Sequence, residues 1–430
     1  MRILIVGHGG REHALLWKLR QDAPDANLFV TRGNGGTRAL ATAIPFDPAD
    51  ASALAEWADG NEIDLTVVGP EAALDAGIAD EFAERRLPLF GPPREAAAIE
   101  TSKAYAKSLM ARAGVPTAAF GSFTDASAAE AFIRERGAPI VVKASGLAAG
   151  KGAVLCDDVD AAIDAARGML VHRTFGDAGR TVVIEERLEG EEMSVFALTD
   201  GTHVLDMIPA QDYKRIGEGD TGPNTGGMGA CAPVSLSSDA LRDRIRRDIF
   251  EPTLAALRDD GRVYRGLLYA GLMITDDAPR VIEFNARFGD PETQALLPLL
   301  ESSLLEPIRE IANGGSIAGA SLEWRDAGAV TTVLAAHGYP AAARKGDAID
   351  IPEDVAHADD IVVFHAGTRT ASDGQLITDG GRVLAVTAVG PAVPEAAERS
   401  RAAADAIAFD GKQFRRDIAW RELARHARTG

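Results

Sequence analysis

Cysteine is nearly absent from this 430-residue chain. Only Cys156 and Cys231 occur, and neither has metal-ligand spacing or a cysteine nearby, which disfavours a disulfide framework and a structural zinc site. The sequence also lacks any apolar run near the roughly 20 residues that a membrane-spanning helix requires. Its first apolar residues end in a glycine turn and not in a signal-peptide cleavage site. We therefore expect a soluble cytoplasmic protein with reduced thiols.

Positive charge is scarce as well, because 45 lysines and arginines against 64 aspartates and glutamates leave a net charge of -19. Such an acidic balance disfavours nucleic acid or an anionic membrane as the main partner. Small anionic substrates would instead need local groups of cations. With 46% hydrophobic residues and a length beyond one ordinary core, the chain is expected to form roughly two to four packed units. We expect it to be a monomer.

Residues 1–100 repeat the pattern of a strand, a glycine-bearing turn and a helix. The strands are marked by apolar runs at 3–6, 28–30, 65–68 and 89–90. This alternation predicts a doubly wound parallel sheet, whose ligands bind outside the carboxyl ends of the strands. Glycine-rich turns follow the strands at 7–10, 33–37 and 69–71. A dinucleotide is the first ligand that such a beginning suggests, but Glu12 stands where the third fingerprint glycine is required, which disfavours a nicotinamide or flavin cofactor.

Further units are expected beyond a boundary near residue 100, where a Gly-Pro-Pro segment ends the first unit. A helix at 101–113 leads into a compact part with a glycine loop between two strands, and then into a larger antiparallel sheet with strands at 267–275 and 280–285. The tail is rich in strands and ends in a helix. The predicted fold class is therefore α/β and multidomain. We name the predicted units N-terminal (1–100), central (101–325) and C-terminal (326–430).

A lysine- and glycine-rich loop follows the strand predicted at 140–144. Lys143 lies at the end of that strand and Lys151 lies within the loop. Glycines let successive backbone N–H groups turn toward phosphate oxygens, and lysines supply the positive charge that a nucleotide needs. We expect Gly146, Gly150 and Gly152 to cover the phosphates of ATP. The structural alternative is that the loop is only a wide turn and that Lys143 extends from the end of the strand without binding a ligand.

An acidic segment follows the apolar strand near residue 182. Adenine needs backbone donors and acceptors in an apolar slot, and ribose hydroxyls need a carboxylate. We expect Glu185, Glu186, Leu188 and Glu192 to bind the nucleoside. By itself this pattern is weak, since acidic residues after a strand are often a solvated turn.

The most informative segment is the strand that leads to Arg287. Alternation along a strand predicts Glu283, Asn285 and Arg287 on one face, with Ile282 and Phe284 facing the core. A carboxylate and an amide oxygen are hard ligands that suit Mg²⁺. An arginine beside them can stabilise a transferring phosphoryl group. Solvent exposure is the alternative, and it is weakened because a polar Gly-Asp-Pro-Glu loop continues from the same strand end.

A second group of charges precedes a glycine-rich loop at 221–229. Asp212 and Lys214 alternate along a predicted strand, and Asn224 lies in the loop. Together they could hold an amino acid, whose ammonium group would pair with Asp212 and whose carboxylate would pair with Lys214 or Arg287. The alternative is a flexible surface loop.

In these motifs the sequence resembles the phosphoribosylamine–glycine ligases (glycinamide ribonucleotide synthetases), a family of ATP-grasp enzymes of purine biosynthesis. The resemblance runs nearly from end to end. The most specific segments are GPNTGGMG at 222–229 and FNARFGDPE at 284–292. Supporting segments lie at 7–14, 68–71, 143–152, 211–215, 269–273, 364–368, 380–384 and 414–418.

The resemblance implies a reaction in which ATP, glycine and 5-phosphoribosylamine give ADP, phosphate and glycinamide ribonucleotide through glycyl phosphate. It implies a central ATP-grasp fold with a lid, residues from about 122 to 192, set into the larger sheet. It also implies Mg²⁺ (or Mn²⁺) on Glu283 and Asn285, with Lys103, Lys143 and Arg287 stabilising charge during phosphoryl transfer.

The N-terminal sheet is then free for the phosphosugar, because the central unit already supplies the nucleotide's loop, hinge and metal strand. Gly9 and Gly10 open a helix whose N-terminal N–H groups favour a phosphate. Glu71 can accept hydrogen bonds from ribose hydroxyls. We expect phosphoribosylamine at Gly9, Gly10, Gly69, Pro70 and Glu71.

Three residues depart from the family pattern: His8, Ser145 and Tyr213 stand where Asn, Asp and His are more usual. His8 and Tyr213 are expected near the substrates, so the departures concern affinity and not the type of reaction. Two rival functions remain. Another ATP-grasp ligase, acting on bicarbonate or formate, would lack the segments around Asp212 and Asn224. A nucleotide-binding regulatory protein would have lost its metal or phosphate ligands.

Overall fold

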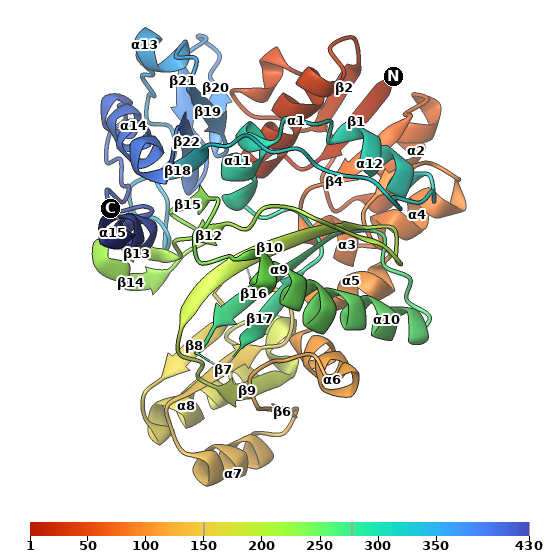
Figure 1. Ribbon diagram of the computed structural model, residues 1–430, viewed down its shortest axis with the longest axis vertical. Coiled ribbons are helices and arrows are strands. Elements are labelled where there is room, and N and C mark those ends of the chain that lie inside the picture. Colours follow the sequence, from red (N-terminus) through yellow and green to blue (C-terminus); the bar gives the residue numbers. More distant parts are fainter. Residues whose placement is uncertain (149–150, 277, 430) are drawn as a thin grey trace.

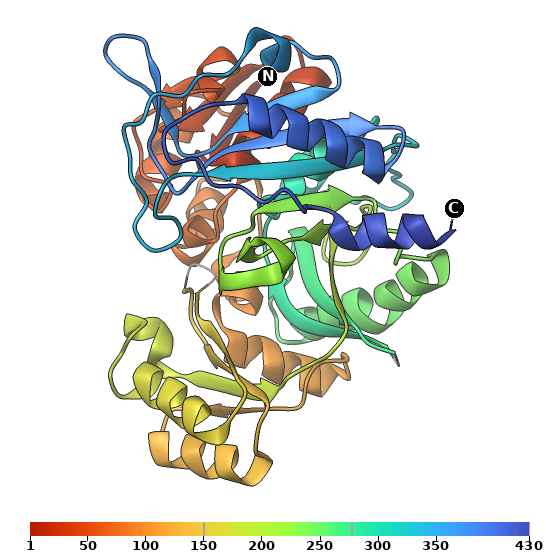
Figure 2. The same ribbon diagram turned by 90° about the vertical axis from the view of Figure 1, so that its left-hand side faces the viewer.

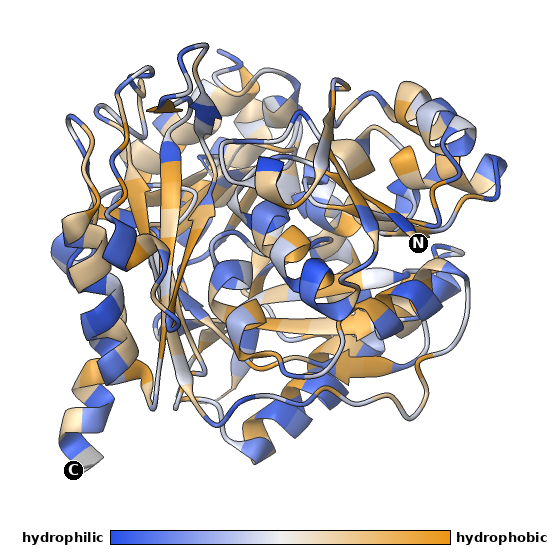
Figure 3. Cartoon of the chain, turned by 90° about the horizontal axis from the view of Figure 1, so that it is seen from above, coloured by the Kyte–Doolittle hydropathy of each residue, from blue (hydrophilic) through white to orange (hydrophobic). Residues whose placement is uncertain are grey.

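The computed structural model describes residues 1–148, 151–276 and 278–429. Figures 1 and 2 show the lid at one end of the long axis. The N-terminal and C-terminal units lie at the other end, and the larger sheet of the central unit lies between. Seen from above, hydrophobic residues follow the strands of the interior, while the outer helices mix hydrophobic with hydrophilic residues (Figure 3). The fold is therefore α/β and layered around several sheets.

The N-terminal unit contains the predicted parallel sheet, with strand order β3-β2-β1-β4-β5. Ile3 and Leu4 lie on opposite faces of β1 and both are fully buried, because helices cover both faces of the sheet. The prediction of a doubly wound sheet is confirmed. Its elements are β1 (Arg2–Val6), α1 (Gly10–Asp22), β2 (Asn27–Thr31), η1 (Thr37–Ala39), β3 (Thr42–Ile44), α2 (Ala51–Gly60), β4 (Leu65–Val68), α3 (Glu71–Asp75), α4 (Ile78–Glu84) and β5 (Leu89–Phe90).

The connection to the central unit consists of two helices and not of the single helix expected at 101–113. Helix α5 (Arg94–Thr101) ends at Ser102, whose extended backbone breaks the helix. Helix α6 (Lys103–Ala113) then begins, with the Ser102 hydroxyl accepting the N–H of Tyr105 as an N-cap. Lys103 is therefore the first residue of a new helix.

The lid is a four-stranded antiparallel sheet of order β6-β9-β7-β8 with its own core. Helices α7 and α8 pack together against it. The strand expected at 140–144 is present with those bounds, and the strand expected after the glycine loop spans residues 153–156. The elements are β6 (Phe120–Phe123), α7 (Ala126–Arg136), β7 (Ile140–Ala144), β8 (Ala153–Cys156), α8 (Val159–Leu170), η2 (Gly176–Arg180) and β9 (Val182–Glu186).

The larger sheet has the order β11-β10-β16-β17 and is antiparallel. A β-bulge interrupts the pairing of its last two strands, since Gly271 pairs with Glu283 but Leu272 pairs with Val281. The expectation that Ile282 faces the core is therefore wrong: Val281 joins Phe284 in the core, and Ile282 is only half-buried. The elements are β10 (Glu191–Thr199), β11 (Val204–Asp206), α9 (Asp239–Ile245), η4 (Arg246–Phe250), α10 (Glu251–Asp259), β16 (Gly266–Ile274), β17 (Pro279–Asn285), α11 (Glu292–Leu296), η5 (Leu297–Leu299) and α12 (Leu305–Ala312).

Three strands of the C-terminal unit share one sheet with two short strands of the central unit, in the order β12-β15-β18-β22-β19, while β20 and β21 form a separate pair. This sheet spans the boundary expected near residue 326, a connection that the sequence did not indicate. Its strands are β12 (Gln211–Asp212), β15 (Gly229–Ala232), β18 (Gly328–Ala335), β19 (Ile361–His365) and β22 (Arg382–Gly390). The remaining elements are β13 (Arg215–Gly217), η3 (Glu218–Asp220), β14 (Thr221–Asn224), α13 (Glu353–Ala356), β20 (Thr368–Thr370), β21 (Leu376–Thr378), α14 (Val393–Ala406) and α15 (Trp420–Thr429).

The glycine turn at 33–37 joins the N-terminal and C-terminal units. The amide of Asn34 donates to the carbonyls of His8 and His365, at 2.9 and 2.8 Å. The N–H of His365 donates to Nδ1 of His13 at 2.8 Å. Burial and the neighbouring His365 lower the pKa of His13 to about 3, so His13 is neutral at neutral pH. This turn is therefore occupied by contacts between units.

Both cysteines are buried and unpaired. None of the helices that the described residues form is long and apolar enough to cross a membrane.

A buried arginine fixes the C-terminal segment against the β13–β14 hairpin. Arg415 is 1% exposed, and its guanidinium contacts the carboxylates of Asp220 and Asp417, each at 2.8 Å. It also lies over the ring of Tyr213, with 5.4 Å to the ring centroid. Tyr213 is itself buried among apolar residues, and its place near a substrate stays a prediction.

The Arg415 contacts predict a large stability difference between two adjacent arginines. Arg415→Ala should lower the free energy of unfolding by roughly 3 kcal/mol, because it removes a buried cation from the half-buried carboxylates of Asp220 and Asp417. Arg416→Ala is the matched control; Arg416 is 55% exposed in its pair with Asp405, and its loss should cost less than about 1 kcal/mol. Urea unfolding of both variants measures the difference. Equal losses would show that the buried pair adds nothing.

Candidate active site

Arg287 lies where the end of β17 meets the N-terminal unit. Its guanidinium contacts Oε2 of Glu71 at 3.2 Å, Oε1 of Glu100 at 3.0 Å and Oδ1 of Asn285 at 3.1 Å. Burial acts to raise the pKa of Glu71, but the positive charges of Arg287 and Arg11 lower it to about 2. The structure thus brings Glu71, expected at the phosphosugar, into contact with Arg287, expected at the transferring phosphoryl group.

Glu100 was not predicted and completes the contacts of Arg287. Its second oxygen accepts the backbone N–H of Ala286 at 2.6 Å, and burial raises the pKa of its carboxyl despite the nearby Arg287. Conversely, burial opposes the charge of Arg287, but Glu100 and Glu71 raise the pKa of the guanidinium. Arg287 therefore remains charged and is held in one orientation.

Glu283 lies two residues before Asn285 on β17, in a strongly positive environment. Burial acts to raise the pKa of Glu283, but the charges of Lys103, Lys214 and Lys143 hold it below its usual value. An ionised carboxylate and an amide oxygen on one strand are a fitting donor pair for Mg²⁺. Among the residues that the structure describes, no group of three or more His, Cys, Asp and Glu side chains could hold a metal ion. A metal at Glu283 and Asn285 would thus need further oxygens from water or substrate.

Lys143 contacts both the lid and the larger sheet. Its ammonium pairs with Oε1 of Glu185 and donates to the carbonyl of Ile282, at 3.4 Å, beside the bulge of β17. Lys107, another residue that was not predicted, contacts Oε2 of Glu185 at 2.5 Å and the hydroxyl of Thr117 at 2.7 Å. Lys107 follows Lys103 by one helical turn, which is the only sequence signal that could have identified it.

The four residues expected at the nucleoside differ in burial and in the residues that they contact. Glu185 is buried, and although burial acts to raise the pKa of its carboxyl, Lys143 and Lys107 lower it. Glu186 is exposed and its carboxylate accepts from Arg280 at 3.3 Å. Leu188 is half-buried. Glu192 contacts Nζ of Lys214 at 2.5 Å.

Lys214 brings together the charges expected to hold an amino acid. Its ammonium is 3.7 Å from Oδ2 of Asp212, in addition to its contact with Glu192. Burial raises the pKa of Asp212 to about 7 although Lys214 acts to lower it, so a bound cation would favour the ionised form of Asp212. Asn224 is half-buried at the end of β14, where it pairs with Arg215 across the hairpin.

The glycine loop of the lid is packed closely at both described ends. The N–H of Gly146 donates to the carbonyl of Ala178 at 3.1 Å, and a Cβ at Gly146 would lie 2.7 Å from the Cα of Ala178. A Cβ at Gly152 would lie 2.6 Å from the Cβ of Ala148. Lys151 is exposed, and its ammonium donates to the carbonyl of Pro340 at 3.1 Å. Gly150 lies outside the described residues.

Ser145, one of the three residues that depart from the family pattern, lies at the start of this loop. Its carbonyl accepts the N–H of Lys103 at 2.8 Å, and its hydroxyl accepts the N–H of Ala104 at 3.0 Å. Ser145 thus ties helix α6 to the lid. The side chain of His8 is exposed.

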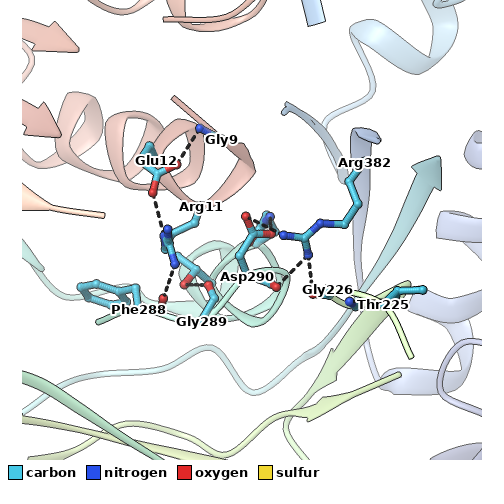
Figure 4. A network of polar contacts seen from close by, with 12 residues as sticks. Gly9, Arg11, Glu12, Thr225, Gly226, Phe288, Gly289, Asp290 and Arg382 are labelled. Atoms are coloured by element: carbon cyan, nitrogen blue, oxygen red, sulfur yellow. Dashed lines mark hydrogen bonds and ion pairs between the residues drawn. The ribbon is translucent and has the colours of Figure 1, made fainter. Parts of the chain in front are cut away.

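The glycines of the N-terminal turns leave space for Glu12. Its Oε2 accepts the N–H of Gly9 at 2.6 Å, and its Oε1 accepts from Nε of Arg11 at 2.7 Å (Figure 4). A Cβ at Gly69 would overlap the same carboxylate. A Cβ at Gly10 would lie 2.6 Å from Nε2 of Gln294. The Gly9 N–H is thus engaged within the protein, and Pro70, the N-cap of α3, leads directly to Glu71.

Comparison with known proteins gives consistent matches along the chain. Three family models match: the N domain of phosphoribosylglycinamide synthetase at residues 1–100, its ATP-grasp (A) domain at 101–293 and its C domain at 329–421. A phosphoribosylamine–glycine ligase of Pseudomonas aeruginosa is 47% identical over 428 residues, covering 99% of both chains. One from Escherichia coli O6:H1 is 46% identical over 431 residues, again covering 99% of both.

Solved structures agree with these matches. The crystal structure of phosphoribosylamine–glycine ligase from Thermotoga maritima aligns with a TM-score of 0.86 and 34% identity, covering 97% of this chain and 100% of that one. Biotin carboxylase from Campylobacter jejuni aligns with a TM-score of 0.75 at 16% identity, covering 96% and 92%, and shares the fold alone. The predicted ATP-grasp fold is thereby confirmed. The chain belongs to the phosphoribosylglycinamide synthetase family.

Proposed function

We propose that this protein joins glycine to 5-phosphoribosylamine at the expense of ATP, giving ADP, phosphate and glycinamide ribonucleotide. One observation carries the proposal: the positive charges of Lys103, Lys143, Lys214 and Arg287 all act on the half-buried carboxylate of Glu283. A polyanion and a metal ion fit such a site together. The family membership and the names of the relatives support the same reaction.

The first step activates the carboxylate of glycine. An amine cannot displace oxide from a carboxylate, so a carboxylate oxygen attacks the γ-phosphorus of ATP. The bond from that phosphorus to the β-bridging oxygen breaks, which yields glycyl phosphate and ADP. Lys103, Lys143 and Arg287 stabilise the charge on the transferring oxygens, and Arg287 is already oriented by Glu71 and Glu100.

Glu283 and Asn285 would hold Mg²⁺ (or Mn²⁺) in this proposal. The lowered pKa of Glu283 keeps the carboxylate ionised, and Asn285 offers an amide oxygen next to it. When bound, the ion neutralises charge on the nucleotide phosphates.

The second step transfers the glycyl group to the amine. The amine nitrogen of phosphoribosylamine attacks the acyl carbon, the C–O bond to phosphorus breaks, and phosphate leaves as the nitrogen loses a proton. Asp212 would pair with the ammonium of glycine, while Lys214 and the hairpin residue Asn224 complete the amino-acid site. The contact between Arg287 and Glu71 supports a phosphosugar next to the acyl phosphate.

The remaining predicted residues keep their proposed places around these two steps. Gly146, Gly150, Lys151 and Gly152 would cover the ATP phosphates and exclude water, because both glycyl phosphate and the sugar amine hydrolyse readily. The nucleoside would lie near Glu185, Glu186, Leu188 and Glu192. Phosphoribosylamine would lie along Gly9, Gly10, Gly69, Pro70 and Glu71. The engaged Gly9 N–H leaves the later N–H groups of that turn for its phosphate. We propose a monomer that acts in the cytoplasm.

The direct test of this function is phosphate release by the purified protein. Release should require ATP, glycine and phosphoribosylamine together, and glycinamide ribonucleotide should accumulate in equal amount. Release that depends on bicarbonate or formate would indicate a different ATP-grasp ligase. Binding of ATP without any release would indicate a regulatory nucleotide-binding protein.

Glu283→Gln should bind ATP but lose most turnover. The change removes one charge from the proposed metal site at nearly constant volume, and the loss should be on the order of 2–4 kcal/mol in transition-state stabilisation. Steady-state rates across a Mg²⁺ titration measure it. Glu301→Gln is the matched control, since Glu301 is 56% exposed and 3.8 Å from Arg325. Near-normal activity of Glu283→Gln at limiting Mg²⁺ would reject the metal assignment.

Arg287→Lys should also be damaging, because an ammonium group cannot replace a planar fork that contacts Glu71, Glu100 and Asn285 at once. We expect a decrease in kcat of roughly 100-fold. Arg325→Lys, in an exposed ion pair, is the control and should retain the wild-type kcat. If Arg287→Lys kept both the rate and the glycine affinity, the guanidinium would have no part in the reaction.

A further inference from the structure

Arg382, the first residue of β22, extends from the C-terminal unit toward the active site. Its Nη1 donates to the carbonyl of Gly226 at 2.6 Å and to the carbonyl of Asp290 at 2.8 Å. Its Nη2 is 3.3 Å from Oδ2 of Asp290. Figure 4 shows the guanidinium between the two loops that contain these carbonyls. One side chain of the C-terminal unit thus connects two separate loops of the central unit.

Asp290 extends this connection to the N-terminal unit. Its Oδ1 accepts from Nε2 of Gln294 at 2.8 Å. Burial acts to raise the pKa of Asp290, but the charges of Arg382 and Arg11 and a hydrogen bond from the backbone N–H of Arg11 lower it. Arg11 in turn donates to the carbonyl of Phe288 at 3.0 Å. An ionised Asp290 therefore lies between helix α1 and Arg382 (Figure 4).

The loops that contain Gly226 and Asp290 pack so closely that a Cβ atom would not fit between them at the glycines. A Cβ at Gly226 would lie 3.2 Å from Cζ of Arg382. A Cβ at Gly227, whose φ is +112°, would overlap Cδ of Pro291. The hydroxyl of Tyr339, also from the C-terminal unit, accepts the N–H of Gly226 at 3.0 Å. The glycines at 226–227 thus permit contact between loops and do not form an open, flexible segment.

Both loops adjoin residues of the proposed reaction. Asn224 precedes Gly226 by two residues, and Arg287 precedes Asp290 by three. By contrast, the described contacts of Lys143 and Lys107 at the proposed nucleotide site join helix α6 and the segment after it to the lid and the larger sheet, and they do not involve Arg382. Displacing Arg382 should therefore disturb the acyl-transfer side of the site and leave the nucleotide side largely unchanged.

We propose that Arg382 is a positioning residue through which the C-terminal unit takes part in acyl transfer. It holds the Gly226 and Asp290 carbonyls at a fixed separation, and so sets the hairpin that contains Asn224 against the strand end that contains Arg287. The proposal rests on the proposed function, because it concerns the glycine and phosphoribosylamine side of that same site.

Kinetics of Arg382→Ala and Arg382→Lys test this role. Arg382→Ala should lower kcat/KM for glycine and for phosphoribosylamine on the order of 10- to 100-fold, since it removes charge-assisted hydrogen bonds to both loops. The dissociation constant for ATP should change less than about twofold. Arg382→Lys retains the charge opposite Asp290 but not the fork, and should lose about tenfold or less. Millimolar guanidinium should partly restore Arg382→Ala.

The matched control is Arg369→Ala on β20 of the same unit. Arg369 is 53% exposed and its Nε is 4.0 Å from Oδ1 of Asp379, so its loss should leave kcat/KM unchanged. If Arg382→Ala matched Arg369→Ala, or if ATP binding fell as much as the other two constants, the positioning role would be wrong.

Hydrogen exchange separates a failure of this proposal from a failure of the proposed function. A wild-type protein that releases no phosphate with all three substrates would reject the function. Amide exchange at residues 224–229 needs no turnover. It should be faster in Arg382→Ala than in wild type, and unchanged in Arg369→Ala. Unchanged exchange in Arg382→Ala would overturn the proposal.

Discussion

The central physical constraint in this molecule is the positive charge of Arg287, whose side chain is only 16% exposed. A charge removed from water needs close partners, and Arg287 obtains them from two other elements, Glu71 on α3 and Glu100 on α5. The ion pairs fix the N-terminal unit against the end of β17. The same two carboxylates leave the guanidinium in a defined orientation, which is what electrostatic stabilisation of a reacting group requires.

The same balance of charges extends across the rest of the site. Lys143 and Lys107 share Glu185 on the lid, and Lys214 contacts Glu192. Lys107 connects helix α6 to the lid, and Lys143 also connects the lid to β17 through the carbonyl of Ile282. Lys214 connects β10 to the segment that leads into the β13–β14 hairpin. Lys143, Lys107 and Lys214 each have a carboxylate partner, so their positive charges are balanced within the fold.

Much of the fold could be predicted from the sequence because it depends on local patterns. The strands β4 and β7 have the expected bounds since each is a short apolar run between turn signals. The error at Ile282 arose because alternation assumes an unbroken ladder, and the bulge in β17 shifts the pattern by one residue. The pairing of β15 with β18 joins distant segments, and no local pattern specifies such a partner.

The candidate site shows the same contrast between residues marked by a local pattern and residues whose partners are distant in the sequence. The roles of Glu283, Asn285 and Arg287 stay predictions; these residues were singled out because their residue types and spacing suit a metal and a phosphoryl group. Glu100 and Arg382 were not, because a single charged residue on a helix or strand carries no signal until its distant partner is known. The glycines near the N-terminus were expected to face a ligand.

The structure shows a second reason for glycine at these positions: the side chain of Glu12 occupies the space that a Cβ atom would need. The side chain of Glu12 thus explains glycines at several other positions. The sequence alone does not indicate this, because the positions are distant from one another along the chain.

The claim at the centre of this account is that the cations around Glu283 activate a carboxylate by phosphorylation. Turnover of glycine labelled with oxygen-18 in its carboxylate tests it directly, with mass spectrometry of the released phosphate. The account predicts that each phosphate carries one oxygen from glycine, because the bond between that oxygen and the acyl carbon breaks in the second step. Phosphate without the label, formed while glycinamide ribonucleotide accumulates, would contradict it.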